Sequence, residues 1–127
     1  CLDLMEEFYG PAFQCTFDFA NFVQCRQDTL EAYDMLKPYI SYIHVKDAMW
    51  EDGMVVPAGM GDGHVAEILE KLDQNGYQGF LSLEPHLADF AGFKGLEQLS
   101  KAKGRSDGAS AFCQAYAALV GLLENAI

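Results

Sequence analysis

Three short apolar runs alternate with segments of helical periodicity, and this alternation constrains the fold more than any other feature of the chain. The runs are rich in aromatic and β-branched residues, which predicts strands. They span residues 13–19, 39–45 and 79–83. Apolar side chains at helical spacing predict helices at residues 1–9, 29–39, 64–75 and 109–126. Strands that alternate with helices in this order favour right-handed βαβ units, so we expect an α/β fold with a parallel sheet.

Glycine-rich or polar segments are predicted to connect these elements. Residues 47–63 are expected to form a loop, because they contain four glycines and a proline. We expect a second, irregular loop at residues 87–95, a short helix at 93–101 that overlaps its end, and a polar break at 104–108. The last helix is rich in Ala and Leu, so we expect it to face the core over much of its circumference.

The size and charge of the chain restrict its class. A chain of 127 residues is about one domain, and half of its residues are hydrophobic, which is enough for a core. The net charge of −11 would repel a phosphate backbone or an anionic membrane, so we expect neither a nucleic acid nor a membrane as partner. The sequence contains no apolar run of about 18 residues, as a membrane-spanning helix requires, and no recognisable signal peptide.

The cysteines and the first residues bear on the origin of the chain. Four cysteines without CxxC spacing are typical of reduced thiols, so we expect a cytoplasmic protein.

Residues 1–9 resemble the end of a helix rather than the start of a protein, and the first residue is not Met. A three-stranded parallel sheet would also have two open edges. We therefore expect a fragment or a processed chain.

Three polar residues stand where the predicted strands end. Asp18 closes the first strand, His44 the second and Glu84 the third. In a parallel α/β sheet these ends face the same side, where such folds build their active sites. One Asp, one His and one Glu make a mixed nitrogen and oxygen ligand set for a divalent ion, with Mn, Mg, Zn and Co as candidates. Taken singly, a turn-forming Asp, a hydrogen-bonded His and an exposed Glu are ordinary, so the pattern alone leaves both interpretations open.

Four motifs then resemble a known family. They are "FDFANF" at residues 17–22, "YIHVKDA" at 42–48, "PAGMGDG" at 57–63 and "GYQGFLSLEPHL" at 76–87. In this order they resemble the C-terminal half of the xylose-isomerase-like TIM barrels, a family of sugar phosphate isomerases and epimerases that also includes family 2 AP endonucleases. The resemblance implies a partial (β/α)8 barrel of about three C-terminal βα units, with strands six to eight of the eight that a full barrel has. Residues 1–9 would then be a helix of a preceding unit, 13–103 the metal-site units and 104–127 the C-terminal helix.

The resemblance also implies a chemistry. In the family a divalent metal is held by Glu, Asp, His and Glu, and Asp18, His44 and Glu84 match the second, third and fourth of these. The first Glu has no counterpart in this chain. Glu84 would also be catalytic, as one of two carboxylates that move a proton next to a sugar carbonyl. The resemblance thus implies a sugar or sugar-phosphate isomerase or epimerase. Because the chain carries only one of the two proton-moving carboxylates, we expect the isolated chain to have little turnover.

Further residues are weaker candidates for binding substrate. Lys46 points the same way as His44, so it is predicted either to bind a substrate phosphate or hydroxyl or to pair with Asp47. Asn21 stands where some relatives carry a His that helps to bind substrate, and an Asn could hydrogen-bond a sugar hydroxyl. His86 is predicted either to line the pocket or to orient Glu84.

The glycines of the 57–63 motif leave three interpretations open. They could let the loop close over a substrate, offer backbone N–H groups to an oxyanion, or form only a turn.

Two other functions remain as alternatives. A metal-dependent AP endonuclease is opposed by the net charge of −11 and by the single His among the matched ligands. A non-catalytic half-barrel would self-associate, because association buries its open edges and its inner face. We therefore expect either a homo-oligomer or a complex with the missing N-terminal half-barrel.

Overall fold

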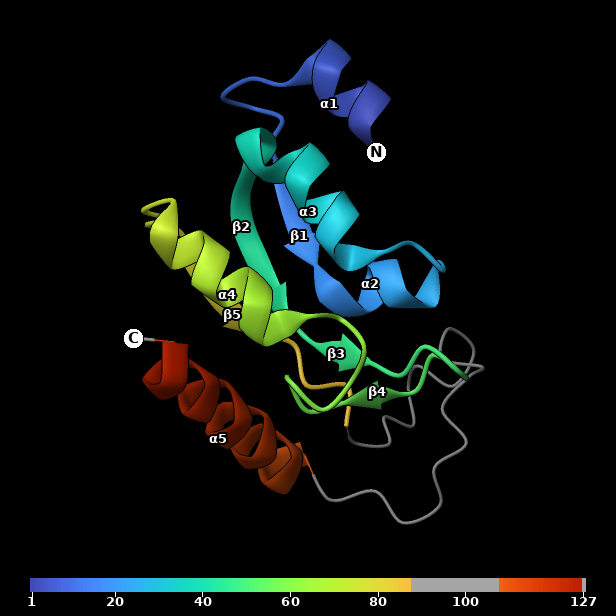
Figure 1. Ribbon diagram of the computed structural model, residues 1–127, viewed down its shortest axis with the longest axis vertical. Coiled ribbons are helices and arrows are strands. Elements are labelled where there is room, and N and C mark those ends of the chain that lie inside the picture. Colours follow the sequence, from blue (N-terminus) through green and yellow to red (C-terminus); the bar gives the residue numbers. More distant parts are fainter. Residues whose placement is uncertain (88–107, 127) are drawn as a thin grey trace.

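A three-stranded parallel sheet forms the centre of the protein. In the computed structural model, which describes residues 1–87 and 108–126, the sheet contains β1 (Cys15–Asp18), β2 (Ile40–Val45) and β5 (Phe80–Leu83) in the order β1-β2-β5. Both strand pairs are parallel. The predicted α/β class and the parallel sheet are confirmed (Figure 1). The predictions for residues 88–107, including the short helix at 93–101, lie outside the described residues.

Four of the helices lie where periodicity predicts them; the first three are shorter than predicted and the last begins one residue earlier. They are α1 (Leu2–Phe8), α3 (Thr29–Leu36), α4 (Val65–Gln74) and α5 (Gly108–Ala126). The predicted helix at 29–39 ends earlier because Pro38 follows α3, and the chain tightens there into a 3₁₀ turn at Lys37–Tyr39. None of the helices in the described ranges is both long and apolar enough to cross a membrane.

Three short elements correct the sequence prediction. The segment predicted as the end of the first strand begins helix α2 (Phe19–Gln24), because the Asp18 side chain accepts a hydrogen bond from the Asn21 N–H and caps the helix. Inside the predicted loop, β3 (Asp47–Ala48) and β4 (Val55–Val56) pair as an antiparallel ladder. Two-residue strands are too short to produce an alternating pattern in the sequence.

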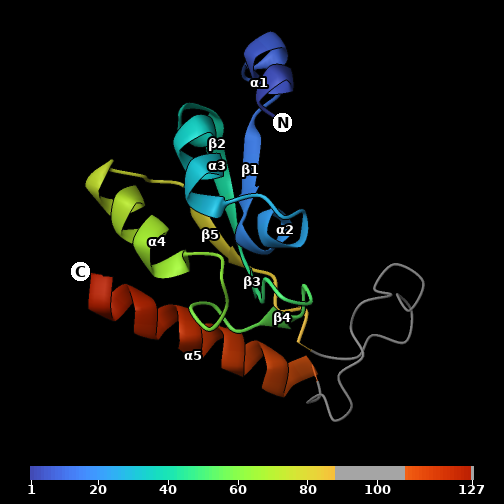
Figure 2. The ribbon, with the colours of Figure 1, turned by 45° about the vertical axis from the view of Figure 1, so that its right-hand side comes forward.

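The core lies on one face of the sheet. Phe17 and Ile43, which are register partners on β1 and β2, are fully buried beneath α3 and α4. Figures 1 and 2 show these two helices on the same side of the sheet. The neighbouring positions point the other way, and there Phe80 is 75% exposed. The described residues therefore leave the second face of the sheet uncovered.

Helix α5 runs beside α4 and also contacts β5 (Figure 2). One stripe of small and apolar residues is buried, namely Ala111, Ala115 and Leu119. Phe112 and Tyr116 are exposed, so the expectation that this helix faces the core over much of its circumference is wrong for its described residues. Its high Ala content does not distinguish a buried from an exposed face, because Ala is also the strongest helix former.

Candidate functional site

Asp18, His44 and Glu84 come together at the carboxyl end of the sheet. Asp18 ends β1 and is the register partner of His44 on β2, while Glu84 directly follows β5. Each residue contributes one ligand atom, and these atoms all lie within 4.8 Å of one another. The structure thus brings together the three residues that the strand ends select in the sequence.

The two oxygens of Asp18 have different surroundings. Oδ1 accepts the Asn21 N–H at 3.0 Å, which fixes the carboxylate at the start of α2. Oδ2 is buried and lies 3.1 Å from Nζ of Lys46 and 3.8 Å from Nδ1 of His44. Burial raises the pKa of Asp18, although the charge of Lys46 and the Asn21 N–H oppose the shift. Helix capping therefore uses one carboxylate oxygen and leaves the other to face Lys46 and His44.

Glu84 is the more accessible carboxylate. Its side chain is 32% exposed, against 7% for Asp18. Oε2 lies 3.4 Å from Nδ1 of His44, and Oε1 lies 3.2 Å from Nε2 of His86. Burial alone would raise the pKa of Glu84, but the hydrogen bond and charge of Lys46 outweigh it and hold the pKa below its usual value. Glu84 is therefore ionised at neutral pH and open to a molecule on the uncovered face.

Lys46 joins the two carboxylates. Its Nζ lies 3.1 Å from Oδ2 of Asp18 and donates a hydrogen bond of 2.9 Å to Oε2 of Glu84. The alternative that Lys46 pairs with Asp47 is wrong, because its side chain crosses to the ends of β1 and β5 and is only 6% exposed. The sequence did indicate that Lys46 faces the site, because it stands two residues after His44 and so lies on the same side of the strand.

Asp47 has a role that sequence reasoning missed. Its carboxylate is fully buried and accepts four backbone N–H groups at 2.8–3.0 Å, those of Ala48, Gly59, Gly61 and Gly63. The glycine N–H groups do bind an oxyanion, and that oxyanion is the side chain of Asp47. A Cβ at Gly61 or Gly63 would come within 2.6 Å of Oδ1 of Asp47, which explains why both positions are glycine.

The two remaining predicted residues lie at the edge of the site. His86 contacts Glu84, as one of its two predicted roles requires. Asn21 is exposed. Its backbone N–H donates to the Asp18 side chain that caps α2. Binding of a substrate by Asn21, His86 or Lys46 stays a prediction.

The donor set fits a divalent cation. It combines two carboxylate oxygens with one imidazole nitrogen, which suits Mn, Zn or Co, and its oxygens also suit Mg. The buried Oδ2 of Asp18 already has a cationic partner in this structure, because Nζ of Lys46 lies 3.1 Å from it. A divalent cation between the three side chains would contact the same oxygen.

Comparisons with known proteins agree with this architecture. The family model described as Xylose isomerase-like TIM barrel matches residues 1–108. Among solved structures, the chain resembles a xylose isomerase domain protein from Planctomyces limnophilus, with a TM-score of 0.66 and 24% sequence identity. That match covers 98% of this chain and 42% of the other, so this chain spans less than half the length of that protein. At this identity the likeness concerns the fold alone. A comparison with curated proteins found no match.

Proposed function

Because this chain belongs to the xylose isomerase-like TIM barrel family and folds as part of such a barrel, we propose that it carries the metal-binding wall of a sugar or sugar-phosphate isomerase or epimerase. The observation that carries the proposal is the convergence of Asp18, His44 and Glu84 at the carboxyl end of the sheet. Active sites of TIM barrels lie at this end. The four free cysteines support a reducing compartment, so we place the activity in the cytoplasm.

The three side chains would hold a divalent ion, with Mn, Mg, Zn or Co as candidates. When bound, such an ion polarises a carbonyl or hydroxyl oxygen of the sugar and stabilises the negative charge that develops as a neighbouring proton leaves. Asp18 is suited to a fixed ligand, because the cap of α2 holds one of its oxygens in place. His44 adds the nitrogen ligand from the adjacent strand.

Glu84 would move the proton. It is the carboxylate of the site that a substrate on the open face can reach, and its pKa lies below the usual value, so it is present as the base. His86, at 3.2 Å from Oε1, would orient it. Net epimerisation needs a second acid on the opposite face of the carbon, and the family resemblance assigns that role to a Glu without a counterpart in this chain. One carboxylate is sufficient for exchange of the proton with solvent.

We therefore expect the chain to exchange the C–H proton next to a ketose or aldose carbonyl with D₂O, with little net epimerisation. NMR on a panel of sugars and sugar phosphates, with Mn, Mg, Zn or Co added, measures this exchange. Glu84→Gln keeps the shape of the side chain but removes the base, so exchange should fall by a factor of about 100 or more. The matched control Glu124→Gln on α5 should leave exchange unchanged. Exchange that persists in Glu84→Gln, or no exchange with any metal, would contradict the proposal.

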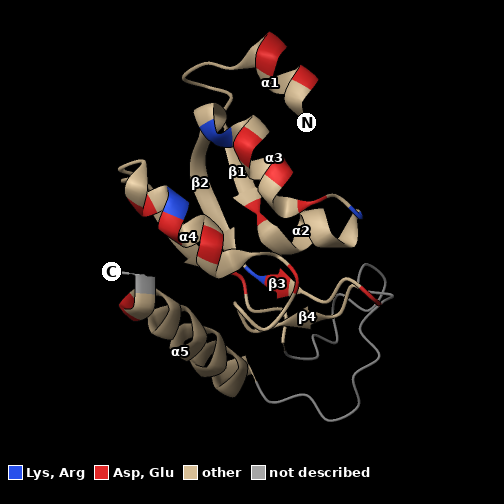
Figure 3. Cartoon of the chain, viewed as in Figure 1, with Lys and Arg blue, Asp and Glu red and all other residues tan. Residues whose placement is uncertain are grey.

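The nuclease alternative finds little support in the charge distribution. Acidic residues outnumber basic ones by 19 to 8, and Figure 3 shows acidic positions on several elements around the sheet. A surface of this sign repels a DNA backbone, and the cluster in the described residues includes one His. We therefore retain proton transfer on a small sugar as the proposed function.

The uncovered face of the sheet supports a second proposal, that copies of this chain associate through it. Phe80 is 75% exposed, and its ring centroid lies 6.0 Å from that of Tyr42. Within the described residues, the outer edges of β1 and β5 also lack a neighbouring strand. Covering exposed aromatic rings and open strand edges is favourable, so association is expected.

Light scattering at micromolar concentration should accordingly give a mass above that of one chain. Phe80→Ser should shift the distribution toward the monomer, because it removes the most exposed large apolar side chain in the described residues. Phe112→Ser is the matched control, since Phe112 is 50% exposed but belongs to α5 and not to the sheet. A clean wild-type monomer would refute this second proposal.

A further inference from the structure

Lys46 lies between the two carboxylates that would bind the metal. Its Nζ contacts Oδ2 of Asp18 at 3.1 Å and Oε2 of Glu84 at 2.9 Å. The same Oε2 lies 3.4 Å from Nδ1 of His44, and Oδ2 lies 3.8 Å from it. The ammonium therefore uses the oxygens that face the imidazole, and a cation held by all three side chains would have to share or take over these oxygens.

We propose that Lys46 is a built-in counter-ion, which neutralises part of the site when no metal is bound and is displaced when a divalent ion enters. Metal occupancy would then be set by competition between the ion and Lys46. This inference rests on the proposed metal site and adds to it a residue that controls affinity, a role separate from the predicted binding of substrate.

The charges favour displacement. Asp18 and Glu84 contribute two negative charges, and Lys46 contributes one positive charge. A dication in place of the ammonium would balance both carboxylate charges. A dication and an ammonium held by the same oxygens would lie only a few ångströms apart, where like charges repel strongly in a partly buried site. The side chains of Asp18 and Lys46 are 7% and 6% exposed, so solvent screens this repulsion weakly.

The displacement needs only a side-chain movement. The carbonyl of Lys46 accepts the Ala20 N–H at 3.1 Å, and the carbonyl of Val45 accepts the Glu84 N–H at 3.2 Å, so the backbone is held on both sides. A small hollow beside Lys46 and Glu84 is lined mainly by apolar residues, including Val55, Ala58 and Leu83. Apart from Glu84, the described residues that line this hollow offer a freed ammonium no charged partner, so it would turn to the open face of the sheet.

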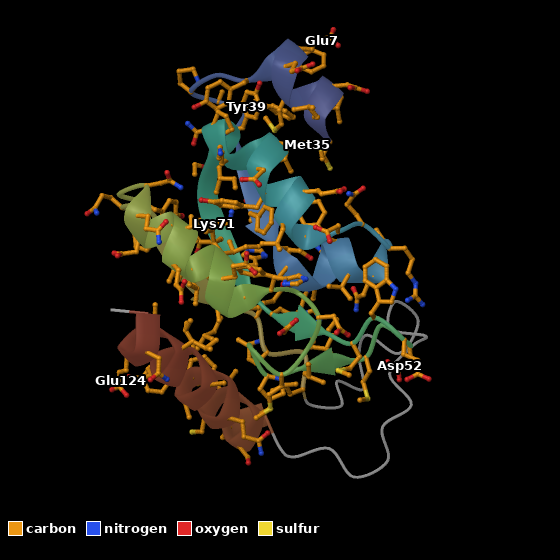
Figure 4. All side chains as sticks on the ribbon, viewed as in Figure 1. Glu7, Met35, Tyr39, Asp52, Lys71 and Glu124 are labelled. Atoms are coloured by element: carbon orange, nitrogen blue, oxygen red, sulfur yellow. The ribbon has the colours of Figure 1, made fainter. Side chains whose placement is uncertain are left out.

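Metal affinity is the first test, measured by isothermal titration of the 127-residue chain with Mn and Zn. Lys46→Gln removes the competing charge, so it should bind metal about tenfold more tightly or better. Lys46→Arg keeps the charge and should remain close to wild type. Lys71→Gln is the matched control for loss of one positive charge, because Lys71 lies in the last turn of α4 (Figure 4), the helix that packs on the covered face of the sheet, and should change little.

The second test uses the wild-type protein and does not depend on how a variant folds. Amine labelling followed by mass spectrometry should show Lys46 protected without metal and labelled several-fold faster with saturating metal. Lys37 and Lys71 serve as internal controls whose labelling should not respond. Equal metal affinity in Lys46→Gln, or labelling of Lys46 that ignores metal, would overturn the inference and leave the proposed function standing. No metal binding by wild type or any variant would overturn both.

Discussion

Replacing Asp47 with alanine should lower the free energy of unfolding by about 2–6 kcal/mol. The substitution leaves four backbone N–H groups without their acceptor, and two of them, those of Ala48 and Gly63, are in buried hydrogen bonds. A buried donor without a partner costs about 1–3 kcal/mol, whereas water can replace Asp47 at the partly buried N–H groups of Gly59 and Gly61. Urea denaturation measures the loss.

The control for Asp47 is Asp52→Ala in the same region of the chain. Asp52 accepts one exposed hydrogen bond from the Met54 N–H, so its loss should cost no more than about 0.5 kcal/mol (Figure 4). A cost for Asp47→Ala as small as that for Asp52→Ala would show that the carboxylate does not organise the glycine loop.

A glycine pair offers a companion test of the Asp47 account. A Cβ at Gly61 would lie 2.5 Å from the carbonyl oxygen of Ala48 and 2.6 Å from Oδ1 of Asp47, so Gly61→Ala should destabilise the protein. Gly121 lies within α5 with open space around its Cβ position, so Gly121→Ala should stabilise by about 0.5–1 kcal/mol through helix propensity. Opposite signs for the two substitutions would tie the cost at Gly61 to crowding against the Ala48 carbonyl and the Asp47 carboxylate.

Replacing His44 with alanine should weaken divalent metal binding at least about 100-fold. The substitution removes the single nitrogen ligand of the site and leaves two carboxylates that Lys46 already neutralises in part. His44 is the ligand best suited to this test, because its side chain is 36% exposed and caps no helix, unlike Asp18. Isothermal titration with Mn or Zn measures the change.

His64 supplies the matched control. It stands at the start of α4, is 45% exposed and pairs with Glu67 rather than with the site. His64→Ala should therefore leave metal affinity unchanged. Equal affinities for His44→Ala and wild type would remove the imidazole from the proposed ligand set.

The parts of the fold and site that follow local rules could be predicted from sequence. Short apolar runs between helical segments predicted parallel strands, and parallel strands bring their ends to one side, so Asp18, His44 and Glu84 could be grouped without coordinates. This grouping needs only the strand positions and their direction, which the helices between them determine.

The remaining parts depend on contacts between distant segments. The donors to Asp47 at Gly59, Gly61 and Gly63 lie 12–16 residues away, so no local pattern marks their acceptor. Lys46 finds its partners only because β1 and β5 flank β2. Helix α2 escaped prediction because its aromatic residues resemble a continuation of the strand, while the Asp18 cap that starts it also forms part of the site.

The most direct test of the account is a crystal soaked with Mn or Zn and examined for anomalous scattering. We predict one strong peak about 2.0–2.3 Å from Oδ2 of Asp18, a ring nitrogen of His44 and Oε2 of Glu84, with Nζ of Lys46 moved away from both oxygens. An ion bound elsewhere, or no peak between these three side chains at saturating metal, would contradict the proposed site and the function built on it.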